Sequence, residues 1–486
     1  MLFRRAIALA VAALVLAATP SLADMIIKLR DGQVITVPVQ PGDIESLSFT
    51  GSAVPAPAAA SSAVAAPISL APASTAAAAS APAESRDSGV HPPPNALVFP
   101  PMRPDHPSGR VLHVGPSREL KVPSQAAKEA RNGDIVEIDA ADYRGDVAVW
   151  NQNDIVIRGV GGRPHLYADG DAAQGKAIWV THGNKIRISN IEFSGCKVAD
   201  GNGAAIRAEG AGLTLVNVYI HDNEDGLLSA PNPQSDIVIE NSEFAHNGTT
   251  SGSTHGIYIG QVRNFVLRGS YFHDTVTGHH VKTRALNNYI LYNRIIDYSD
   301  TASYSIDVSN GGRTYIIGNV IEKGPRAENY AMIAYAMEGP TNPSQKLYVV
   351  GNTMVMNRSS GLFIRSRSPD PAYVADNIMA GPGMPIIGAG VFVNNVLAGA
   401  HVDAGVLNAN GSRGNRVVSN VRFADAAHYD YRLLSGSPAI GAGVDPGSSD
   451  GFSLRPTYAP LTPLGIAARA TTGPLDDGAI PFQPQG

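Results

Sequence analysis

The stretch IRISNIEF, residues 186–193, decides the fold, because variants of it recur along the chain. In each copy, apolar residues alternate with other residues, an Asn or Gly follows, and a second short apolar run begins. The other copies are LTLVNVYI from Leu213, IVIENSEF from Ile237, FVLRGSYF from Phe265, YILYNRII from Tyr289, YIIGNVIE from Tyr315, LYVVGNTM from Leu347 and AYVADNIM from Ala372. The central Asn or Gly stands at positions 190, 217, 241, 269, 293, 319, 352 and 377, so the intervals run from 24 to 33 residues. Such a period, with several short strands per unit, is typical of a parallel solenoid whose stacked turns share one apolar interior.

The Asn at the centre of most repeats has a structural use. Its amide can bond the backbone of the bend and the equivalent Asn of the next turn, which forms a ladder along the solenoid. We therefore assign these Asn residues to the scaffold.

The chain from about Val111 to Ala442 resembles the right-handed parallel β-helix of the pectate-lyase-like superfamily. The repeats carry most of this resemblance, and the ending YRLLSGSPAIGAGVDPG, residues 431–447, resembles the closing segment of many secreted members. The resemblance implies an all-β fold, a right-handed parallel β-helix, without specifying a substrate.

The segment VPSQAAKEARNGDIVEID, residues 122–139, precedes the repeats. Its Ser, Ala and Glu residues at positions 124–130 favour a short helix that Asn132 and Gly133 would end. A solenoid has to cover the apolar interior of its terminal turn. We therefore expect a short N-terminal capping helix.

The chain ends and linkers differ in composition from the repeats. Residues 1–23 read as a secretory signal peptide, because Arg4 and Arg5 precede an apolar run and Ala23 closes a small-residue ending. Residues 24–51 alternate around Asp31 and Gly32 as in a small β-hairpin. Residues 52–107 are mostly Ala, Pro, Ser and Val, which predicts a flexible linker. Residues 108–445 then form the parallel β-helix domain, and residues 446–486 an irregular C-terminal tail.

Composition limits the partners. The net charge of -5 gives no basic excess for nucleic acid, and no later segment is apolar for long enough to span a membrane. Cys196 is the only cysteine, so an internal disulfide is excluded. We expect a secreted or periplasmic monomer.

The segment GHHVKTRA, residues 278–285, gathers four basic residues in a chain with 16% charged residues. It belongs to a second strand of the repeat, whose copies include DGLLS from Asp225, HGIYIG from His255 and YSIDVS from Tyr304. Because strand residues point alternately to opposite faces, we expect an interior row of Ile257, Ile259, Val281, Ile306 and Val308. The residues expected to face solvent are Tyr258, His280, Lys282, Arg284 and Asp307.

This outer row predicts a cationic groove for an acidic polysaccharide. Neighbouring strands lie about 4.8 Å apart, which brings Tyr258, Lys282 and Asp307 within mutual reach. β-Elimination from a uronate needs a cation at the carboxylate, a base for the C5 proton and an acid at the leaving O4. Arg284 suits the first task, Lys282 or His280 the second, and Tyr258 the third. The alternative is a solvated strand face with no reactive role.

The segment VKTRALNNYILYN, residues 281–293, also resembles the Lys-Ser motif and Asn-rich bend of alginate and chondroitin lyases of this fold. The resemblance implies that Lys282 is the base. It also implies a partner Arg one turn later, but Ser309 and Asn310 stand there. Arg284 or Tyr258 would have to replace that Arg.

Further residues are candidates for substrate binding, namely His255, His279, Asp307, Asp225, Glu338 and Arg365. For His255 and His279, a stacked or turn-bonded ladder is the alternative. Glu338 and Arg365 would serve additional sugar subsites or only solubility. The bend HDNEDG, residues 221–226, could hold calcium, although a hydrated turn is preferred, and we predict no metal and no cofactor.

The favoured function is therefore a secreted polysaccharide lyase that cleaves a uronic-acid-containing polysaccharide in a groove on the outside of the β-helix. Two alternatives stay open: a C5-epimerase on the same substrate class, and a non-catalytic acidic-polysaccharide-binding or cell-surface protein.

Overall fold

The computed structural model describes residues 109–298, 301–400, 407–408, 411–469 and 474–484, and the backbone of three strands before them. The chain divides into two compact units, residues 1–88 and 89–486. In the first unit, β1 (Val11–Thr19), β2 (Leu22–Leu29) and β3 (Val34–Pro38) form an antiparallel sheet. The predicted linker lies outside the described residues, as do parts of the predicted signal peptide and hairpin. Those boundaries stay predictions.

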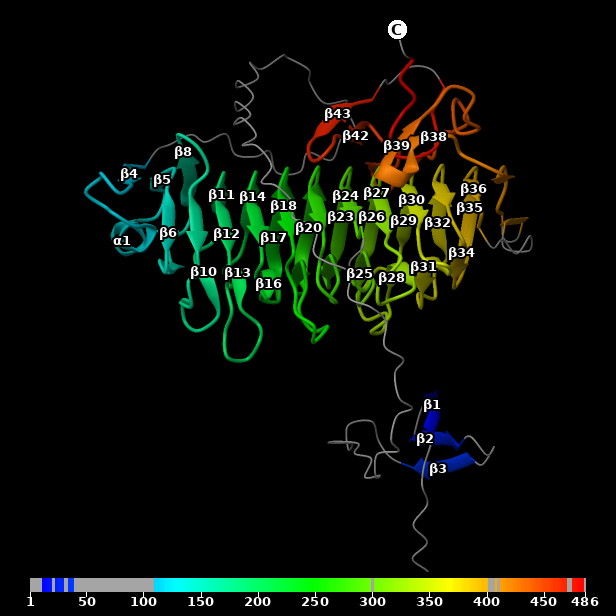
Figure 1. Cartoon of the computed structure of the whole chain (residues 1–486), viewed down its shortest axis with the longest axis horizontal. Helices are drawn as coiled ribbons and strands as arrows, with labels where there is room; N and C mark the ends of the chain where they lie inside the picture. The colour runs from blue at the N-terminus through cyan, green and yellow to red at the C-terminus, as the bar shows by residue number, and fades with distance from the viewer. Residues whose placement is uncertain are drawn as a thin grey trace, which may run out of the picture. The chain divides into compact units, whose positions relative to one another are not determined.

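The second unit is a right-handed parallel β-helix (Figure 1), as the repeats predict. The described strands of the solenoid, β4 to β37, form three parallel sheets, which we call sheets I, II and III. Sheet I comprises β4 (Val111–Val114), β5 (Ile135–Asp139), β8 (Val156–Val160), β11 (Ile186–Ser189), β14 (Leu213–Val216), β17 (Asn232–Glu240), β20 (Val262–Arg268), β23 (Asn287–Leu291), β26 (Arg313–Ile317), β29 (Leu347–Val350), β32 (Ala372–Ala375) and β35 (Gly390–Val393). Sheet II comprises β6 (Asp142–Arg144), β9 (His165–Tyr167), β12 (Glu192–Ser194), β15 (Tyr219–His221), β18 (Glu243–Ala245), β21 (Tyr271–His273), β24 (Arg294–Ile296), β27 (Val320–Lys323), β30 (Thr353–Met356), β33 (Ile378–Ala380), β36 (Val396–Ala398) and β37 (Arg416–Val418). Sheet III comprises β7 (Ala148–Trp150), β10 (Ala177–Thr181), β13 (Ala204–Ala208), β16 (Asp225–Ser229), β19 (Ile257–Ile259), β22 (Val281–Thr283), β25 (Ile306–Val308), β28 (Ala331–Tyr335), β31 (Gly361–Ser366) and β34 (Gly383–Ile387).

Each repeat, such as residues 186–193, forms the corner at which the chain passes from sheet I to sheet II. Strand β11 leads through Asn190 into β12, and each later copy does the same one turn on. Successive turns stack in register, so that Ile188 pairs with Ile157 and Leu215. These inward residues are fully buried in one core that runs along the solenoid, because no single turn can bury its own apolar side chains.

The predicted Asn ladder is continuous in the C-terminal half and buried there from Asn293 to Asn395, whereas the described N-terminal half has one exposed step, from Asn217 Nδ2 to Asn190 Oδ1 at 3.2 Å. The members in the C-terminal half are Asn293, Asn319, Asn352, Asn377, Asn395 and Asn415, and each Nδ2 donates to the Oδ1 of the next at 2.9 Å. In the N-terminal half, the central Asn190 and Asn217 instead have a left-handed backbone with φ of 55° and 52°. There the following residues, Ile191 and Val218, occupy the inward position. The left-handed residue directly follows the aligned end of the sheet I strand in both halves, and only the position of the Asn differs, at this residue in the N-terminal half and one residue later in the C-terminal half.

Other described segments close and cover the solenoid. Helix α1 (Pro123–Glu129) lies at its N-terminal end (Figure 1) and buries Ala126 and Ala127 in the core. The residues after β37 form β38 (Phe423–Asp425), η2 (Ala426–His428), β39 (Asp430–Leu433), β40 (Ser448–Ser449), β41 (Phe452–Ser453), β42 (Tyr458–Pro460) and β43 (Ile466–Ala468). Phe452 packs on the tyrosines of sheet I, and Tyr429 packs on Tyr298 beside sheet II.

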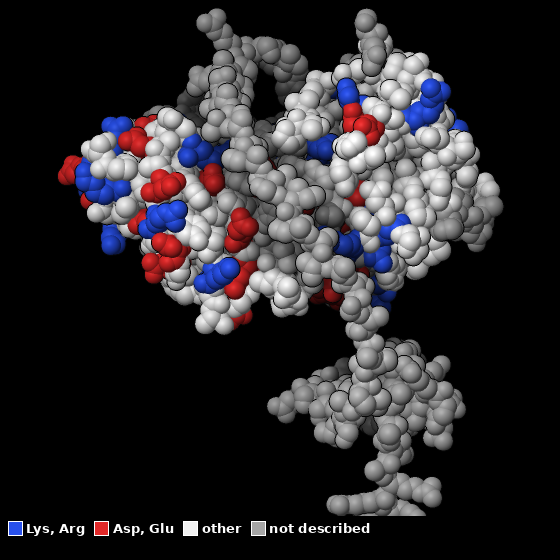
Figure 2. Space-filling view, in the orientation of Figure 1, with Lys and Arg blue, Asp and Glu red and all other residues white. Residues whose placement is uncertain are grey.

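Basic and acidic side chains of the first turns lie interspersed on the face in Figure 2. Within the described part of the chain, no helix combines the length and the apolar character that crossing a membrane requires.

Candidate active site

The outer face of sheet III carries the row that strand alternation predicts. Tyr258 of β19 pairs with Lys282 of β22, and Lys282 pairs with Asp307 of β25. Their strand neighbours Val281 and Ile306 point inward and are fully buried. The phenol, ammonium and carboxylate therefore lie on three successive turns as expected, but Asp307 is buried instead of facing solvent.

The outward orientation expected of His280 is wrong. Its side chain is completely buried, with Nε2 2.5 Å from Asp297 Oδ1 and Nδ1 2.7 Å from Thr275 Oγ1. Strand β22 begins at Val281, so His280 lies in the preceding bend, where the period of two does not apply. His280 thus belongs to a buried polar pair and does not line the groove.

His255 and His279 form a ladder and line the surface at the same time. Their rings stack with centroids 4.8 Å apart, and each Nδ1 accepts the backbone N–H of the next turn, from His279 and Tyr304 respectively, at 3.2 Å. Burial, helped by the charge of Lys282, lowers the pKa of His255 to about 3, and burial also lowers the pKa of His279 well below its usual value. Both rings are therefore neutral near pH 7. Because Nδ1 is an acceptor, Nε2 carries the proton and is a hydrogen-bond donor.

Glu338 neutralises the cationic row. Lys282 Nζ donates to Glu338 Oε1 at 2.7 Å, and Arg284 Nη2 donates to Glu338 Oε2. Burial opposes the ionisation of Glu338, but these two hydrogen bonds hold its pKa below the usual range. Glu338 follows β28, two turns beyond Lys282. It lies over the basic residues, whereas the sequence analysis placed it further along the stripe.

Arg284 connects the basic row to the phenol. Its Nε donates to Tyr258 Oη at 2.6 Å and its Nη1 donates to Asn310 Oδ1 at 2.6 Å. Lys282 Nζ and Arg284 Cζ lie 5.8 and 5.6 Å from the centre of the Tyr258 ring, within the range of cation–π attraction. A phenol oxygen that accepts a guanidinium N–H has its own proton available for another acceptor.

The two aspartates of the prediction are buried. Asp307 Oδ2 accepts the hydroxyl of Ser309 at 2.9 Å and lies 3.6 Å from Lys282 Nζ, and burial raises the pKa of Asp307 to about 6. Asp225 lies below the surface, where its Oδ1 accepts the His255 N–H at 2.7 Å and burial raises its pKa to about 8. Asp225 therefore positions the backbone of His255. The expectation that it lines the groove and binds substrate is wrong.

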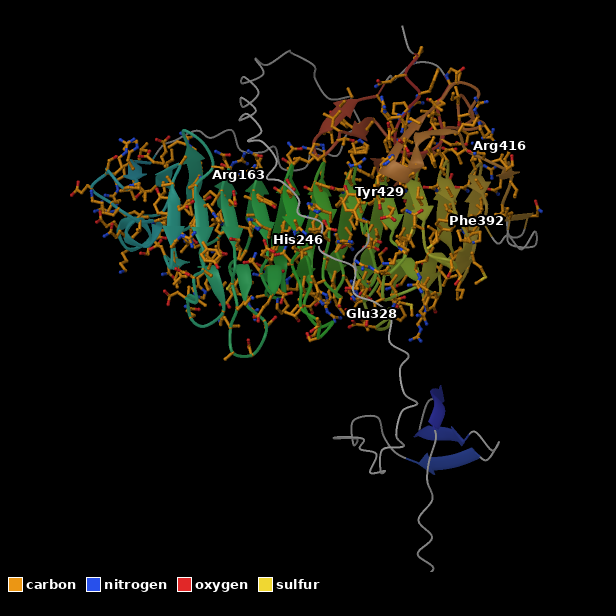
Figure 3. The ribbon with its side chains drawn as sticks, in the orientation of Figure 1. Arg163, His246, Glu328, Phe392, Arg416 and Tyr429 are labelled. Carbon is orange, nitrogen blue, oxygen red and sulfur yellow. The ribbon has the colours of Figure 1, made fainter. Side chains whose placement is uncertain are left out.

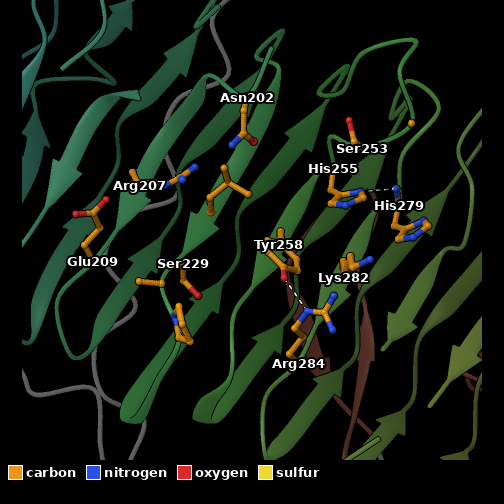
Figure 4. Close-up of a pocket in the computed structure, with 14 residues that line it drawn as sticks. Asn202, Arg207, Glu209, Ser229, Ser253, His255, Tyr258, His279, Lys282 and Arg284 are labelled. Carbon is orange, nitrogen blue, oxygen red and sulfur yellow. Dashed lines mark hydrogen bonds between the residues drawn. The ribbon is translucent and has the colours of Figure 1, made fainter. Parts of the chain in front are cut away.

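These residues surround a surface cavity of about 580 Å³ (Figure 4). The predicted residues in its lining are His255, Tyr258, His279, Lys282 and Arg284. The polar lining residues that the sequence analysis missed are Asn202, Arg207, Glu209, Ser229 and Ser253. Arg207 belongs to the same outer row, since it pairs with Leu228, which pairs with Tyr258. Applying strand alternation one turn before Asp225, to the segment AAIRA, would have found it.

Two predicted sites lie apart from this cavity. Arg365 continues the row two turns beyond Asp307, and its Nη1 lies 3.4 Å from Tyr304 Oη. In the bend considered for calcium, the acidic side chains separate: Asp222 bonds the His221 ring, and Glu224 accepts the N–H of Val198 and of Gly203. These described side chains do not converge on one ion.

Comparisons with known proteins agree with the fold. Residues 150–252 match the family model of the right-handed β-helix region. The matched residues belong to the right-handed parallel β-helix described above. No curated protein sequence matches the chain.

Three solved structures are similar. A pectate lyase, Pel9A, shares 13% identity with a TM-score of 0.46, over 78% of this chain and 98% of its own. The ORF18 protein of Geobacillus virus E2 shares 13% identity with a TM-score of 0.26, over 55% of this chain and 49% of its own. A mutant of the PL6 family alginate lyase AlyGC shares 14% identity with a TM-score of 0.25, over 63% and 53%. Scores this low carry no inference about activity.

Proposed function

We propose that this protein is a polysaccharide lyase that cleaves a uronic-acid-containing polysaccharide by β-elimination in the cavity on sheet III. The observation that carries the proposal is the convergence of Lys282, Arg284 and Tyr258 on one open cavity, with the carboxylate of Glu338 held between the two cations. Glu338 occupies a position that a substrate carboxylate would suit, because a planar guanidinium binds any carboxylate in the same way.

Binding begins with an exchange of carboxylates. The uronate carboxylate takes the place of Glu338 beside Arg284, which neutralises it and makes the C5 proton more acidic. The Nε2–H group of His255 is a neutral donor at the edge of the same cavity, so it can bind a sugar hydroxyl or ring oxygen. The Nε2 of His279 lies 3.5 Å from Asp307 Oδ2. Arg207 lies on the same outer face, three turns before Arg284, and can bind an acidic residue further along the polymer.

The reaction itself is a transfer of two protons. Once Glu338 has moved away, Lys282 loses its closest counter-charge and gives one proton to water, and its neutral amine then takes the C5 proton. The C5–H electron pair forms the C4=C5 double bond, the C4–O4 bond breaks, and O4 takes the proton of Tyr258. Arg284 Nε, already bonded to Tyr258 Oη, stabilises the phenolate that forms. The product carries an unsaturated uronate at its new non-reducing end.

The test is the ultraviolet absorbance of the unsaturated uronate during incubation with a panel of acidic polysaccharides. We expect Lys282→Ala to lower the rate about 10²- to 10⁴-fold while most polymer binding remains. Lys185→Ala is the control, because that side chain is 65% exposed and pairs with Asp154 on another turn. No absorbance change with any polymer, or equal rates for Lys282→Ala and the parent protein, would overturn the proposal.

A C5-epimerase would use the same proton abstraction and return the proton to the opposite face of the sugar. The two activities differ in their products. Incorporation of solvent deuterium at C5 without a new double bond or shorter chains would identify the epimerase.

A non-catalytic binder is favoured by one observation, which is that Lys282 is already paired with both Glu338 and Asp307. Carboxylates on both sides stabilise its positive charge, and that arrangement opposes a role as a base. For a binder, Lys282→Ala would lower affinity modestly, and the unmodified protein would show no turnover.

Export is part of the proposal. The enzyme would meet its polymer outside the cytoplasm after cleavage following Ala23. N-terminal sequencing of the protein recovered from the culture medium or periplasm should find Asp24 first, and an intact Met1 there would count against export through a cleaved leader.

A further inference from the structure

The outer face of sheet II carries the same four-residue motif twice, as YIHD at residues 219–222 and YFHD at residues 271–274. In each copy the histidine ring is held at both nitrogens. His221 Nδ1 lies 2.6 Å from Asp222 Oδ2 and its Nε2 lies 3.1 Å from Glu192 Oε1. His273 has the same two distances to Asp274 and Glu243. We call these groups the first and second clusters.

The two clusters differ at one position. The residue paired with Glu192 from the preceding turn is His165, whereas the residue paired with Glu243 is Tyr219. The first cluster therefore has a second imidazole, whose Nε2 lies 3.7 Å from Glu192 Oε1. One ligand atom from each of His165, Glu192 and His221 lies within 4.8 Å of the other two. Among the described residues, the second cluster is not such a group.

The surroundings of the first cluster turn both rings toward the same point. Asp222 binds the Nδ1 side of His221, so the Nε2 of His221 faces Glu192. Asp142 Oδ1 lies 3.8 Å from His165 Nδ1, and the Nε2 of His165 bonds Ser194 Oγ at 2.7 Å, a contact that a bound ion would replace. A carboxylate on the far nitrogen of a metal-bound histidine fixes its tautomer and orientation. The three side chains are 15 to 26% exposed, so an ion can reach them from solvent.

We propose that His165, Glu192 and His221 bind one divalent transition-metal ion, Zn²⁺ being the best match. Two imidazoles and one carboxylate are a known zinc ligand set that leaves a fourth position open. Calcium is a poor match because it prefers a shell of oxygens. The ligands come from β9, β12 and β15, so the ion would link three successive turns of the N-terminal half. This site is on a different sheet from the cavity of the proposed lyase and does not depend on that function.

The experiment uses the full chain without a polyhistidine tag, freed of metal with a chelator and titrated calorimetrically with Zn²⁺. We expect one ion per chain and a melting temperature that rises with Zn²⁺ concentration, because the ion binds only the folded form. Asp222→Asn should weaken binding about 10- to 100-fold by removing the support of the His221 ring.

The second cluster supplies matched controls. His165→Tyr gives the first cluster the composition of the second and should abolish the site, whereas His273→Ala should leave Zn²⁺ affinity unchanged. Tyr219→His gives the second cluster the missing imidazole and should raise the stoichiometry toward two. His246, labelled in Figure 3, lies beside the second cluster, with its Nε2 3.7 Å from Asp274 Oδ2.

The visible absorption of bound Co²⁺ keeps the proposal testable if a variant does not fold, since coordination by imidazole and carboxylate in the parent protein should intensify the d–d bands. Four results would each overturn the proposal of a metal site. The first two are equal Zn²⁺ affinity in His165→Tyr and the parent protein, and equal weakening of Zn²⁺ binding by His273→Ala and His221→Ala. The other two are Ca²⁺ binding tighter than Zn²⁺ binding, and Co²⁺ bands that do not change when the protein is added.

Discussion

Glu338 controls the charge of the cavity on sheet III, because its carboxylate bonds both Lys282 and Arg284. Its side chain is 41% exposed, so solvent and substrate can reach it. An acidic polymer has to compete with this internal anion for the same donors. We expect Glu338→Gln to raise the affinity for an acidic oligosaccharide about 3- to 10-fold at low salt, an effect of roughly 1 kcal/mol, and the gain should shrink as salt screens the charges.

The measurement is calorimetric titration with an oligouronate at two salt concentrations. Glu328→Gln is the matched control. Glu328 (Figure 3) is an exposed glutamate in the same half of the solenoid, so this substitution removes the same charge at another place. Equal gains in both variants would mean that only net charge matters. An unchanged affinity in Glu338→Gln would show that the polymer does not bind at these cations.

Asp225 makes the stability of the fold depend on pH. Burial raises its pKa to about 8, against the N–H bond from His255 and the charge of Arg207, which lower it. The pKa of an aspartate in the unfolded chain is near 4. Because folding raises this pKa, the carboxyl contributes its full stabilisation below pH 4, and this contribution is lost as the pH rises toward 8. The free energy of unfolding of the parent protein should therefore decrease between pH 5.5 and 8, and we expect Asp225→Asn to remove roughly 3 kcal/mol of that decrease.

Urea unfolding at these two pH values, for the parent protein and Asp225→Asn, measures the effect. The amide keeps the oxygen that accepts the His255 N–H, so the fold should be retained. The same pH slope in both proteins would mean that Asp225 is ionised throughout, and would contradict the assignment of a protonated carboxyl.

For single residues, the sequence predicts the direction of a side chain only where the residue lies inside a regular strand. Alternation places Tyr258, Lys282 and Asp307 correctly, because each lies inside a strand that is paired in register. It fails for His280, which precedes the strand, and for Glu338, whose position depends on the path of the chain after β28. Irregular segments have no period from which to infer the direction of a side chain.

The Asn ladder stabilises the corner between sheets I and II as one element. Asn319 is fully buried; its Oδ1 accepts the backbone and side-chain N–H groups of Asn293, and its Nδ2 donates to Ile290 O. Removing the amide leaves these buried polar groups without a partner, which costs about 1–3 kcal/mol for each group. We expect Asn319→Ala to lower the free energy of unfolding by about 3 kcal/mol.

Chemical denaturation checks this value, with Asn217→Gly as the control. Asn217 lies at the same corner but has a φ of 52°, a conformation that Gly adopts without strain, and its contact with Asn190 is exposed. Equal losses in both variants would show that any change at the corner weakens the fold, and would remove the special role of the inward amide.

The repeat predicts the strands of this corner but not which residue of the bend carries the inward amide. In the N-terminal half the central Asn has the left-handed backbone, and in the C-terminal half Tyr292, Gly318, Gly351 and Asp376 take that role, one position before the Asn. Both arrangements share the same strand pattern. The apolar residues at 191 and 218, where the later repeats place an Asn, are the sequence signal of the difference.

In the second unit, the C-terminal segment covers part of the outer face of sheet I, whereas the cavity on sheet III is open. Tyr289, Tyr315 and Tyr348 stack along the outside of sheet I, and Phe452 of β41 packs against the first two with ring centroids 5.3 and 4.6 Å away. The segment after β37 thus buries an aromatic face, while the cavity on sheet III stays accessible. A solenoid is stabilised mainly by contacts between neighbouring turns, so loosening this cover should act locally.

We therefore expect Phe452→Ala to cost about 3 kcal/mol locally, because its ring is 9% exposed. Amide hydrogen exchange should quicken in β40, β41 and the adjacent strand β26 and stay unchanged in the distant β11, since regions of a protein open with separate free energies. Leu461→Ala is the control, since that side chain is 45% exposed. Polymer binding on sheet III should be the same in both variants, because Phe452 contacts the tyrosines of sheet I. Exchange that quickens equally along all turns would mean that the C-terminal cover and the solenoid unfold as one cooperative unit, and that the open face depends on the covered one.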